Sequence, residues 1–216
     1  MRRVFAAAAG GLLLSWAGLA TVAFAAPVEA YGEYEAIGDV HISPKGDKLV
    51  LATATSDTSR AVVILSVGDG HVLGGINFKD QKLRALQWAD DDHVLITLSQ
   101  TAKPIDLEGP RREWFMTESY EVATGKQTPL LENVDKSMNV AGDVEPRIVD
   151  GHTVLYVEGI YFPSMRGILA LYAIDLTEGR TRLIESSSPN ANGWVIDRAG
   201  NVVAEEDYNQ RRRRRL

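Results

Sequence analysis

Histidines are the first side chains in this sequence that could support chemistry. There are four, namely His41, His71, His93 and His152. His93 and His152 each follow a polar turn, and equivalent turns of neighbouring repeats could bring two imidazoles to one metal ion. No cysteine and no acidic pattern completes a ligand set with zinc spacing. We therefore interpret both histidines as structural residues and expect no metal site and no cofactor.

Two runs of carboxylates are the next candidates, Asp90–Asp92 and Glu205–Asp207. A calcium loop needs a glycine and a downstream bidentate glutamate, and both are missing after Asp90. The first run is therefore interpreted as a turn. The second run could clamp the amine of a peptide, but we favour a solvated strand end because charge runs are usually exposed.

Serine nucleophiles are not indicated. Ser43 and Ser66 have no His–Asp arrangement that would activate them, and they are interpreted as turn or strand residues. The sequence contains no Gly-x-Ser-x-Gly motif. We expect no catalytic residue, and no enzymatic activity from this chain alone.

A repeated unit must position all of these side chains. Each copy is a short strand, a polar turn, a second apolar strand and a third strand that ends at a glycine turn. The copies begin at 39–43, 83–88, 146–149 and 193–196. Their turn glycines Gly70, Gly125 and Gly179 are 55 and 54 residues apart. Glycine suits such turns because it adopts positive φ without a steric penalty, and the flanking Val, Leu, Ile, Tyr and Trp favour strands.

Four-stranded units of this length, stacked radially, form a β-propeller. We predict an all-β chain, a partial β-propeller of about three and a half four-stranded antiparallel blades, after a signal peptide. The blades are expected at about 34–78, 83–134 and 143–187, with the start of a fourth at 191–210, inside an incomplete propeller of residues 26–210. No segment after residue 26 has a helical period. An open arc exposes strand edges and apolar faces, which favours aggregation.

One long loop, Gln100–Arg112, is predicted inside the second blade. It contains two prolines and charges of both signs. Long loops often contact partners, and the alternative is a loop without a special role.

The ends of the chain indicate export. Arg2 and Arg3 precede an apolar stretch at 4–22, and Ala23–Ala25 has the small-x-small pattern of a cleavage site. We predict a signal peptide at 1–25, with a retained membrane anchor as the alternative, and a periplasmic or secreted protein. The basic tail, 211–216, is interpreted as either a binding arm or, preferably, the result of truncation inside a domain. The chain has no cysteine, so no disulfide stabilises it.

The charge of the body excludes some partners. All 29 acidic residues lie within 26–210, whereas seven of the 23 basic residues, at 2, 3 and 211–215, lie outside it. An excess of carboxylates repels phosphate backbones. We expect no nucleic-acid partner and no membrane contact after signal cleavage, and a peptide or protein ligand is the partner class that remains.

The segment Tyr34–Leu49 resembles the first blade of exported bacterial prolyl oligopeptidase-family serine peptidases. Residues 171–176 and 193–197 resemble the later blades, and the similarity covers 31–210. In that family a hydrolase domain with a Ser-Asp-His triad follows the propeller, which restricts access to peptides. The resemblance implies a non-catalytic propeller portion that gates peptide access to a hydrolase domain missing from this chain, and no triad residue can be transferred. The alternatives are a non-enzymatic periplasmic propeller that binds protein or peptide partners, and a degenerate gene product.

Overall fold

The computed structural model describes residues 27–28, 32, 35–56, 59–78, 81–103, 110–186 and 188–207, without the side chains of 139–141. The chain divides into two compact units, Met1–Glu33 and Tyr34–Leu216. The first unit has three described residues, and the fold is that of the second. The predicted signal peptide, 1–25, and the basic tail, 211–216, lie outside the described residues. In the described ranges, no helix is long and apolar enough to cross a membrane.

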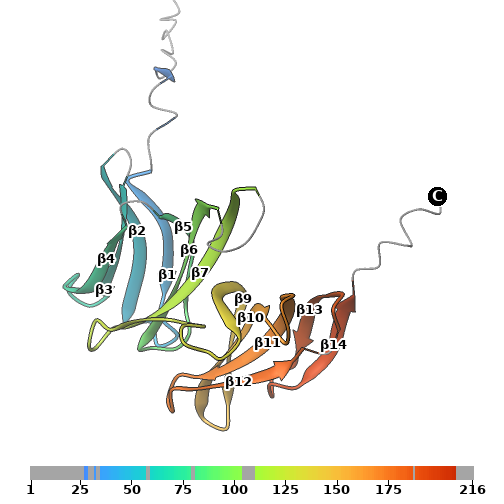
Figure 1. Cartoon of the computed structure of the whole chain (residues 1–216). Coiled ribbons are helices and arrows are strands. Elements are labelled where there is room, and N and C mark those ends of the chain that lie inside the picture. The colour runs from blue at the N-terminus through green and yellow to red at the C-terminus, as the bar shows by residue number, and fades with distance from the viewer. Residues whose placement is uncertain are drawn as a thin grey trace, which may run out of the picture. The chain divides into compact units, whose positions relative to one another are not determined.

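Four antiparallel sheets make up the described part of the second unit, and they follow one another in chain order (Figure 1). The first sheet contains β1 (Ile37–Ile42), β2 (Lys48–Ser56), β3 (Ser59–Ser66) and β4 (Val72–Phe78). The second contains β5 (Lys82–Trp88), β6 (His93–Ala102), β7 (Arg112–Glu121) and β8 (Gln127–Pro129). The third contains β9 (Ser137–Val149), β10 (His152–Tyr161), β11 (Ile168–Asp175) and β12 (Arg180–Glu185). The fourth has two described strands, β13 (Ala191–Ile196) and β14 (Val202–Asp207).

The turns after the third strands repeat in three sheets. Gly70, Gly125 and Gly179 have φ angles of 71°, 72° and 65°, which an L side chain rarely adopts. The amide of each glycine donates to the carbonyl four residues earlier, at 2.8–3.0 Å. The predicted turn glycines therefore occupy equivalent positions.

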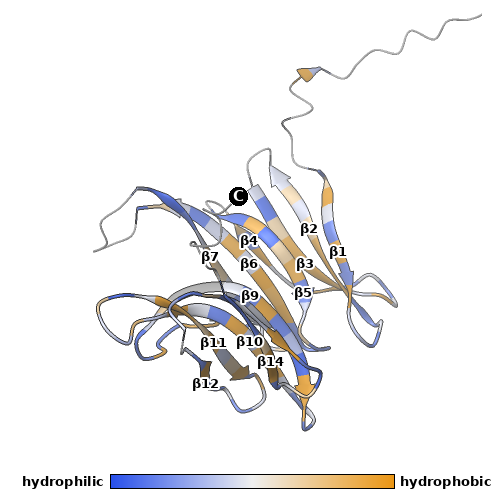
Figure 2. Cartoon of the chain, turned by 90° about the vertical axis from the view of Figure 1, so that its right-hand side faces the viewer, coloured by the Kyte–Doolittle hydropathy of each residue, from blue (hydrophilic) through white to orange (hydrophobic). Residues whose placement is uncertain are grey.

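Apolar side chains fill the spaces between consecutive sheets, because neighbouring residues of a strand point to opposite faces. Figure 2 shows this alternation along the strands. Between the first and second sheets the buried residues include Val50, Val62, Ile64, Trp88, Ile96 and Tyr120. Between the second and third they include Leu95, Leu131, Leu155, Val157 and Tyr172. Between the third and fourth they include Tyr156, Leu171, Trp194 and Ile196.

The predicted all-β chain of repeated antiparallel sheets is confirmed, and the described residues contain no α-helix. The described sheets do not close into a ring. Two predicted bounds were wrong. Residues at both ends of the predicted loop 100–112 are strand residues, because Gln100–Ala102 pair with Arg112–Trp114 and prolong the β6–β7 ladder. The first strand of the third unit begins at Ser137 instead of 146, since pairing with β10 continues through two irregularities.

Candidate functional site

The candidate site is a cleft between the second and third sheets, and the alternation of β5 and β7 positions its first wall. Leu86 and Trp88 are buried against the first sheet, so the intervening Gln87 points towards the third sheet. On β7, Tyr120 packs on the first sheet. The alternate residues Phe115 and Thr117 therefore lie on the opposite face.

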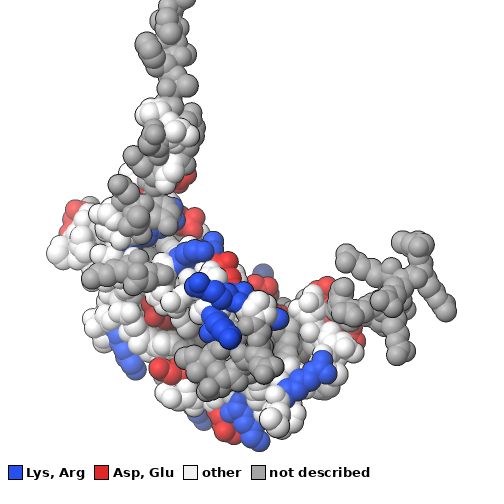
Figure 3. Space-filling view, turned by 45° about the horizontal axis from the view of Figure 1, so that its top comes forward, with Lys and Arg blue, Asp and Glu red and all other residues white. Residues whose placement is uncertain are grey.

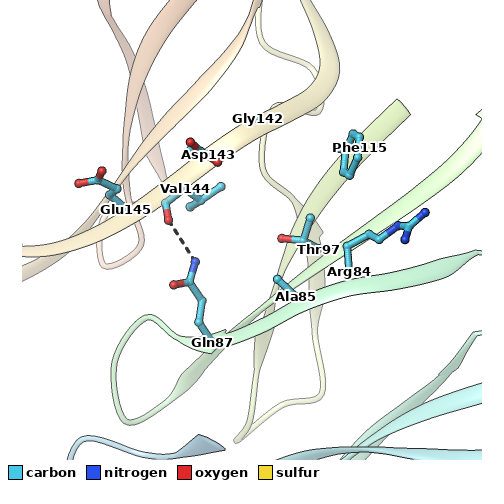
Figure 4. A pocket seen from close by; sticks show the side chains of 9 residues that line it. All are labelled: Arg84, Ala85, Gln87, Thr97, Phe115, Gly142, Asp143, Val144 and Glu145. Carbon is cyan, nitrogen blue, oxygen red and sulfur yellow. Dashed lines mark hydrogen bonds between the residues drawn. The ribbon is translucent and has the colours of Figure 1, made fainter. Parts of the chain in front are cut away.

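The cleft has a volume of about 530 Å³. Figure 4 shows its lining: Arg84, Ala85, Gln87, Thr97 and Phe115 from the second sheet, and Gly142, Asp143, Val144 and Glu145 from β9. Gln87 Nε2 donates to the backbone carbonyl of Val144 at 3.1 Å and joins the two walls.

A smaller cleft of about 290 Å³ adjoins the first and shares Phe115 and Gly142 with it. It extends the site along β10 to Glu158, Gly159 and Ile160. Gly142 on β9 lies close to Glu158 on β10. A Cβ atom at position 142 would lie only 3.2 Å from the Cβ of Glu158, so the absence of a side chain permits this spacing. The ring of Phe115 is 40% exposed and gives the two clefts a common apolar surface.

Two basic side chains of the second sheet, Arg84 and Lys82, share the carboxylate of Glu113, and Arg112 of β7 also lines the smaller cleft. Arg84 Nε donates to Ser99 Oγ at 2.7 Å, and Ser99 donates to Glu113 Oε1 at 2.8 Å. Arg84 also pairs directly with Glu113, and Lys82 Nζ lies 3.6 Å from the same oxygen. The hydrogen bonds from Ser99 and then Arg84 lower the pKa of Glu113, so its carboxylate stays ionised beside the cleft.

The third-sheet wall is acidic. Burial raises the pKa of Glu158, and the negative charges of Asp143, Glu145 and Glu206 raise it further. The backbone amide of Trp194 donates to Glu158 and opposes the shift. Glu145 pairs with Arg147. A cation placed in the smaller cleft would relieve this repulsion, so the wall favours positively charged ligands.

The predicted acidic runs occupy the places expected for structural residues. Asp90–Asp92 form a turn, in which Asp90 Oδ1 accepts from the amides of Asp92 and His93 at 2.8 Å. The exposed run Glu205–Asp207 lies on β14. Trp194 Nε1 donates to Glu205 at 3.2 Å, and the charge of Glu206 acts on Glu158, which brings part of this run near the acidic wall.

His93 and His152 are each paired with a carboxylate. His93 Nδ1 lies 2.9 Å from Asp90 Oδ1. Burial opposes ionisation of Asp90, but hydrogen bonds from His93 and Thr153 lower its pKa to about 2. The hydrogen bond to Asp90 in turn raises the pKa of His93. Because Thr153 belongs to the third sheet, this pair joins two sheets.

His152 lies in the one group of described residues whose geometry suits a metal ion, with Asp175 and Glu178. Its Nδ1 lies 2.9 Å from Asp175 Oδ2, and Asp175 Oδ1 accepts from the amides of Thr177 and Glu178 at 2.9 Å. Glu178 pairs with Arg180. The three side chains are thus bonded to partners that hold the turn after β11. The expectation that the chain has no metal site stays a prediction.

Ser43 and Ser66 have the local roles that the sequence indicated. Ser43 Oγ donates to Asp47 at 3.0 Å and accepts from the amide of Lys48 at 3.1 Å. The side chain of Ser66 bonds to Asp69. The residues that line the cleft, above all Phe115 and Glu158, were not identified from the sequence.

On the face shown in Figure 3, described basic side chains lie beside acidic ones, so this face carries charges of both signs.

No protein-family model matches the sequence, and no curated protein matches it. Three of the solved structures that resemble it are a putative conserved lipoprotein from Clostridium novyi NT, TolB from Acinetobacter baumannii and a puromycin-hydrolyzing peptidase from Mycobacterium tuberculosis. The lipoprotein has 9% identity and a TM-score of 0.41, with 66% of this chain and 89% of the lipoprotein covered.

TolB has 14% identity and a TM-score of 0.41, with 76% of this chain and 36% of TolB covered. The peptidase has 14% identity and a TM-score of 0.29, with 70% of this chain and 29% of the peptidase covered. The chain thus spans about a third of TolB and less of the peptidase. These similarities assign neither a family nor a function to the chain.

Proposed function

We propose that the chain is the non-catalytic, propeller-type part of an exported protein, residues 26–210, and that it binds peptides carrying positive charge in the cleft between its second and third sheets. The observation that carries the proposal is the pairing of an exposed aromatic ring, Phe115, with the acidic wall around Glu158. The ring offers apolar contact, and the carboxylates offer ion pairs to an amine or guanidinium group.

The size of the site supports a peptide. Together the two adjoining clefts extend from Gln87 to Ile160, along strands of both sheets. A volume of about 530 Å³ lies in the range of small-molecule and peptide pockets. The residues that line the two clefts offer apolar contact and charged groups, which supports the binding of a peptide.

Fluorescence anisotropy with two pools of labelled dodecapeptides, one rich in lysine and one rich in glutamate, tests this function. We expect the lysine-rich pool to bind the full chain. Glu158→Gln and Phe115→Ala are each expected to weaken binding about tenfold, equivalent to ~1.4 kcal/mol. Glu132→Gln and Val67→Ala, exposed and outside the cleft, serve as matched controls. Failure of both pools to bind, or equal loss in the controls, would contradict the proposal.

A second candidate function is the gating of peptides on their way to a hydrolase domain. The similarity of 31–210 to the propeller of prolyl oligopeptidase-family peptidases favours it, and so does the lack of a Gly-x-Ser-x-Gly motif in this chain. In that role the same cleft would contact peptides before they reach a nucleophile supplied by another domain. Sequencing of the DNA downstream tests this candidate. A reading frame that encodes a hydrolase domain supports gating, and its absence favours an independent binding propeller.

A further inference from the structure

The first sheet has an apolar face that no other described element covers. Six residues on β1, β2 and β3 lie on it: Val40, Ile42, Leu49, Leu51, Val63 and Leu65. Strand register places them together, because Ile42 pairs with Leu49 and Val40 pairs with Leu51, while β2 and β3 pair Leu49 with Leu65 and Leu51 with Val63. Ile42 is 59% exposed and Val40 is 47% exposed.

The repeat shows what belongs on this face. Equivalent positions follow from the glycine turns, because each turn begins four residues before its glycine, at Ser66, Glu121 and Asp175. These three residues pair with Lys48, His93 and Val154 on the neighbouring strands. The next residues along those strands, Leu49, Val94 and Leu155, are therefore equivalent. Val94 and Leu155 are completely buried, because the preceding sheet packs on them. Leu49 is only partly buried.

The same comparison holds for the first strand of each unit. In the first sheet, Ile42 and Val40 of β1 pair with β2. In the second sheet, Trp88 and Leu86 of β5 pair with the equivalent positions of β6. Trp88 and Leu86 are buried against the first sheet. The uncovered face of the first sheet therefore has the composition and the register of a surface that packs against another sheet of this same repeat.

The fourth sheet carries a face of the complementary kind. Its Trp194 and Ile196 pack on the third sheet, so Val195 points away, and it is 56% exposed. Val203 on β14 is 60% exposed. No described sheet follows the fourth, and its two strands are the equivalents of β1 and β2.

An ion pair at the turns accompanies the packing of consecutive sheets. Where the first sheet meets the second, Lys45 in a first-sheet turn pairs with Asp91 in a second-sheet turn, at 3.4 Å. The first-sheet turn itself carries charges of both signs, on Lys45 and Asp47. The apolar faces, and not the charges of the turns, therefore define the expected junction.

We propose that the uncovered face of the first sheet binds the fourth sheet of a second copy of this chain, in a head-to-tail junction that repeats the packing between consecutive sheets. The contact joins two different surfaces. Two copies can therefore form a closed dimer through two junctions. If the rotation that relates one copy to the next does not close, the copies form an open chain instead. The association is independent of peptide binding in the cleft.

Sedimentation of the full chain tests the junction. We expect the wild-type chain to self-associate and the single variants Ile42→Lys and Val195→Lys to be monomeric, because each places a charge in the contact. Both positions are exposed in one copy, so each variant should keep its circular dichroism spectrum. Leu183→Lys on β12, also exposed, is the matched control and should associate like the wild type.

Mixing the two monomeric variants is the decisive step. Ile42→Lys keeps an intact fourth sheet and Val195→Lys keeps an intact first sheet, so the mixture is expected to form a 1:1 heterodimer through one junction. The junction would also be supported if the wild-type chain forms assemblies larger than a dimer and each single variant is monomeric. A wild-type chain that stays monomeric up to about 100 µM, the range of weak complexes, overturns the proposal. So does a dimer that Ile42→Lys abolishes and Val195→Lys leaves intact, since two identical faces would then be in contact.

Discussion

Glu118 is a buried acid at an apolar junction. Its partner across the ladder is Ile96, which packs against the first sheet. Glu118 Oε1 is buried and has no hydrogen-bond partner among the described residues. Burial therefore raises the pKa of this carboxyl group, and the charged form is the unfavourable one in the folded chain.

Replacement of Glu118 by glutamine is expected to stabilise the chain at pH 7 by roughly 1 kcal/mol, or about 2–4 °C in Tm for a domain of this size. A carboxyl group whose pKa is raised by folding costs stability as pH rises through that pKa, and costs nothing once it is protonated. The gain should therefore shrink as pH falls through the raised pKa and vanish below the ordinary value of 4.5. Thermal melts from pH 3.5 to 7.5 measure it.

The exposed Glu132→Gln substitution is the control for this prediction, and it should change Tm little at any pH. A pH-independent gain at position 118 would mean that packing, and not the charge, limits stability there.

The sequence predicted local partners at the residue scale better than distant ones. Ser43 and Asp90 bond within their own turns, where Asp and Ser are expected to bond nearby backbone. The cleft instead joins Phe115 to Gly142 and Glu158. Their proximity depends on which sheets face each other, and no short motif encodes that. The only available signal was alternation, which places Phe115 on the face opposite the buried Tyr120.

Glycines control the distance between sheets at the scale of single elements. On β4, a Cβ atom at Gly74 would overlap the hydroxyl group of Tyr120, a side chain that is buried between the first two sheets. β4 therefore packs closely on β7 only because position 74 has no side chain.

Gly74→Ala is expected to destabilise the chain by about 1–3 kcal/mol, the usual cost of overpacking. Gly68→Ala is its matched control in the same sheet, because the nearest atom to its Cβ would be Ser66 Oγ at 4.0 Å and its φ angle is not positive. Urea unfolding followed by tryptophan fluorescence measures both. Equal effects of the two substitutions would show that loss of chain flexibility, and not contact with Tyr120, sets the result.

Strand types and turns were predictable at this scale, whereas strand lengths were not. The glycine turns and the apolar second and third strands follow from local propensity. The extensions of β6, β7 and β9 depend on pairing with a neighbour. Polar residues such as Gln100 and Thr101 join the ladder because their backbone groups are paired with β7, although their side chains resemble those of a loop.

The described part of the chain repeats one junction three times, and its sheets differ in how many of their faces are covered. The second sheet packs on the first sheet through Val94 and Ile96 and on the third through Leu95. Among the described residues, the first sheet packs only on the second, through Val50, and exposes Ile42 on the other face. A sequence repeat predicts that consecutive units pack together, but it does not say what lies beyond the first unit.

Hydrogen exchange of backbone amides should show this difference directly. At concentrations where the chain is monomeric, we expect amides of β2 to exchange at least about tenfold faster than the equivalent amides of β6, because local opening is easier where one face lacks packing. Mass spectrometry of peptic fragments that cover Lys48–Ser56 and His93–Ala102 resolves the two strands. Exchange of β2 should slow as concentration rises if its open face becomes covered, while exchange of β6 should not change. Equal protection of both strands in the monomer would instead show that the sheets open together as one cooperative unit, so that the uncovered face costs the first sheet no local stability.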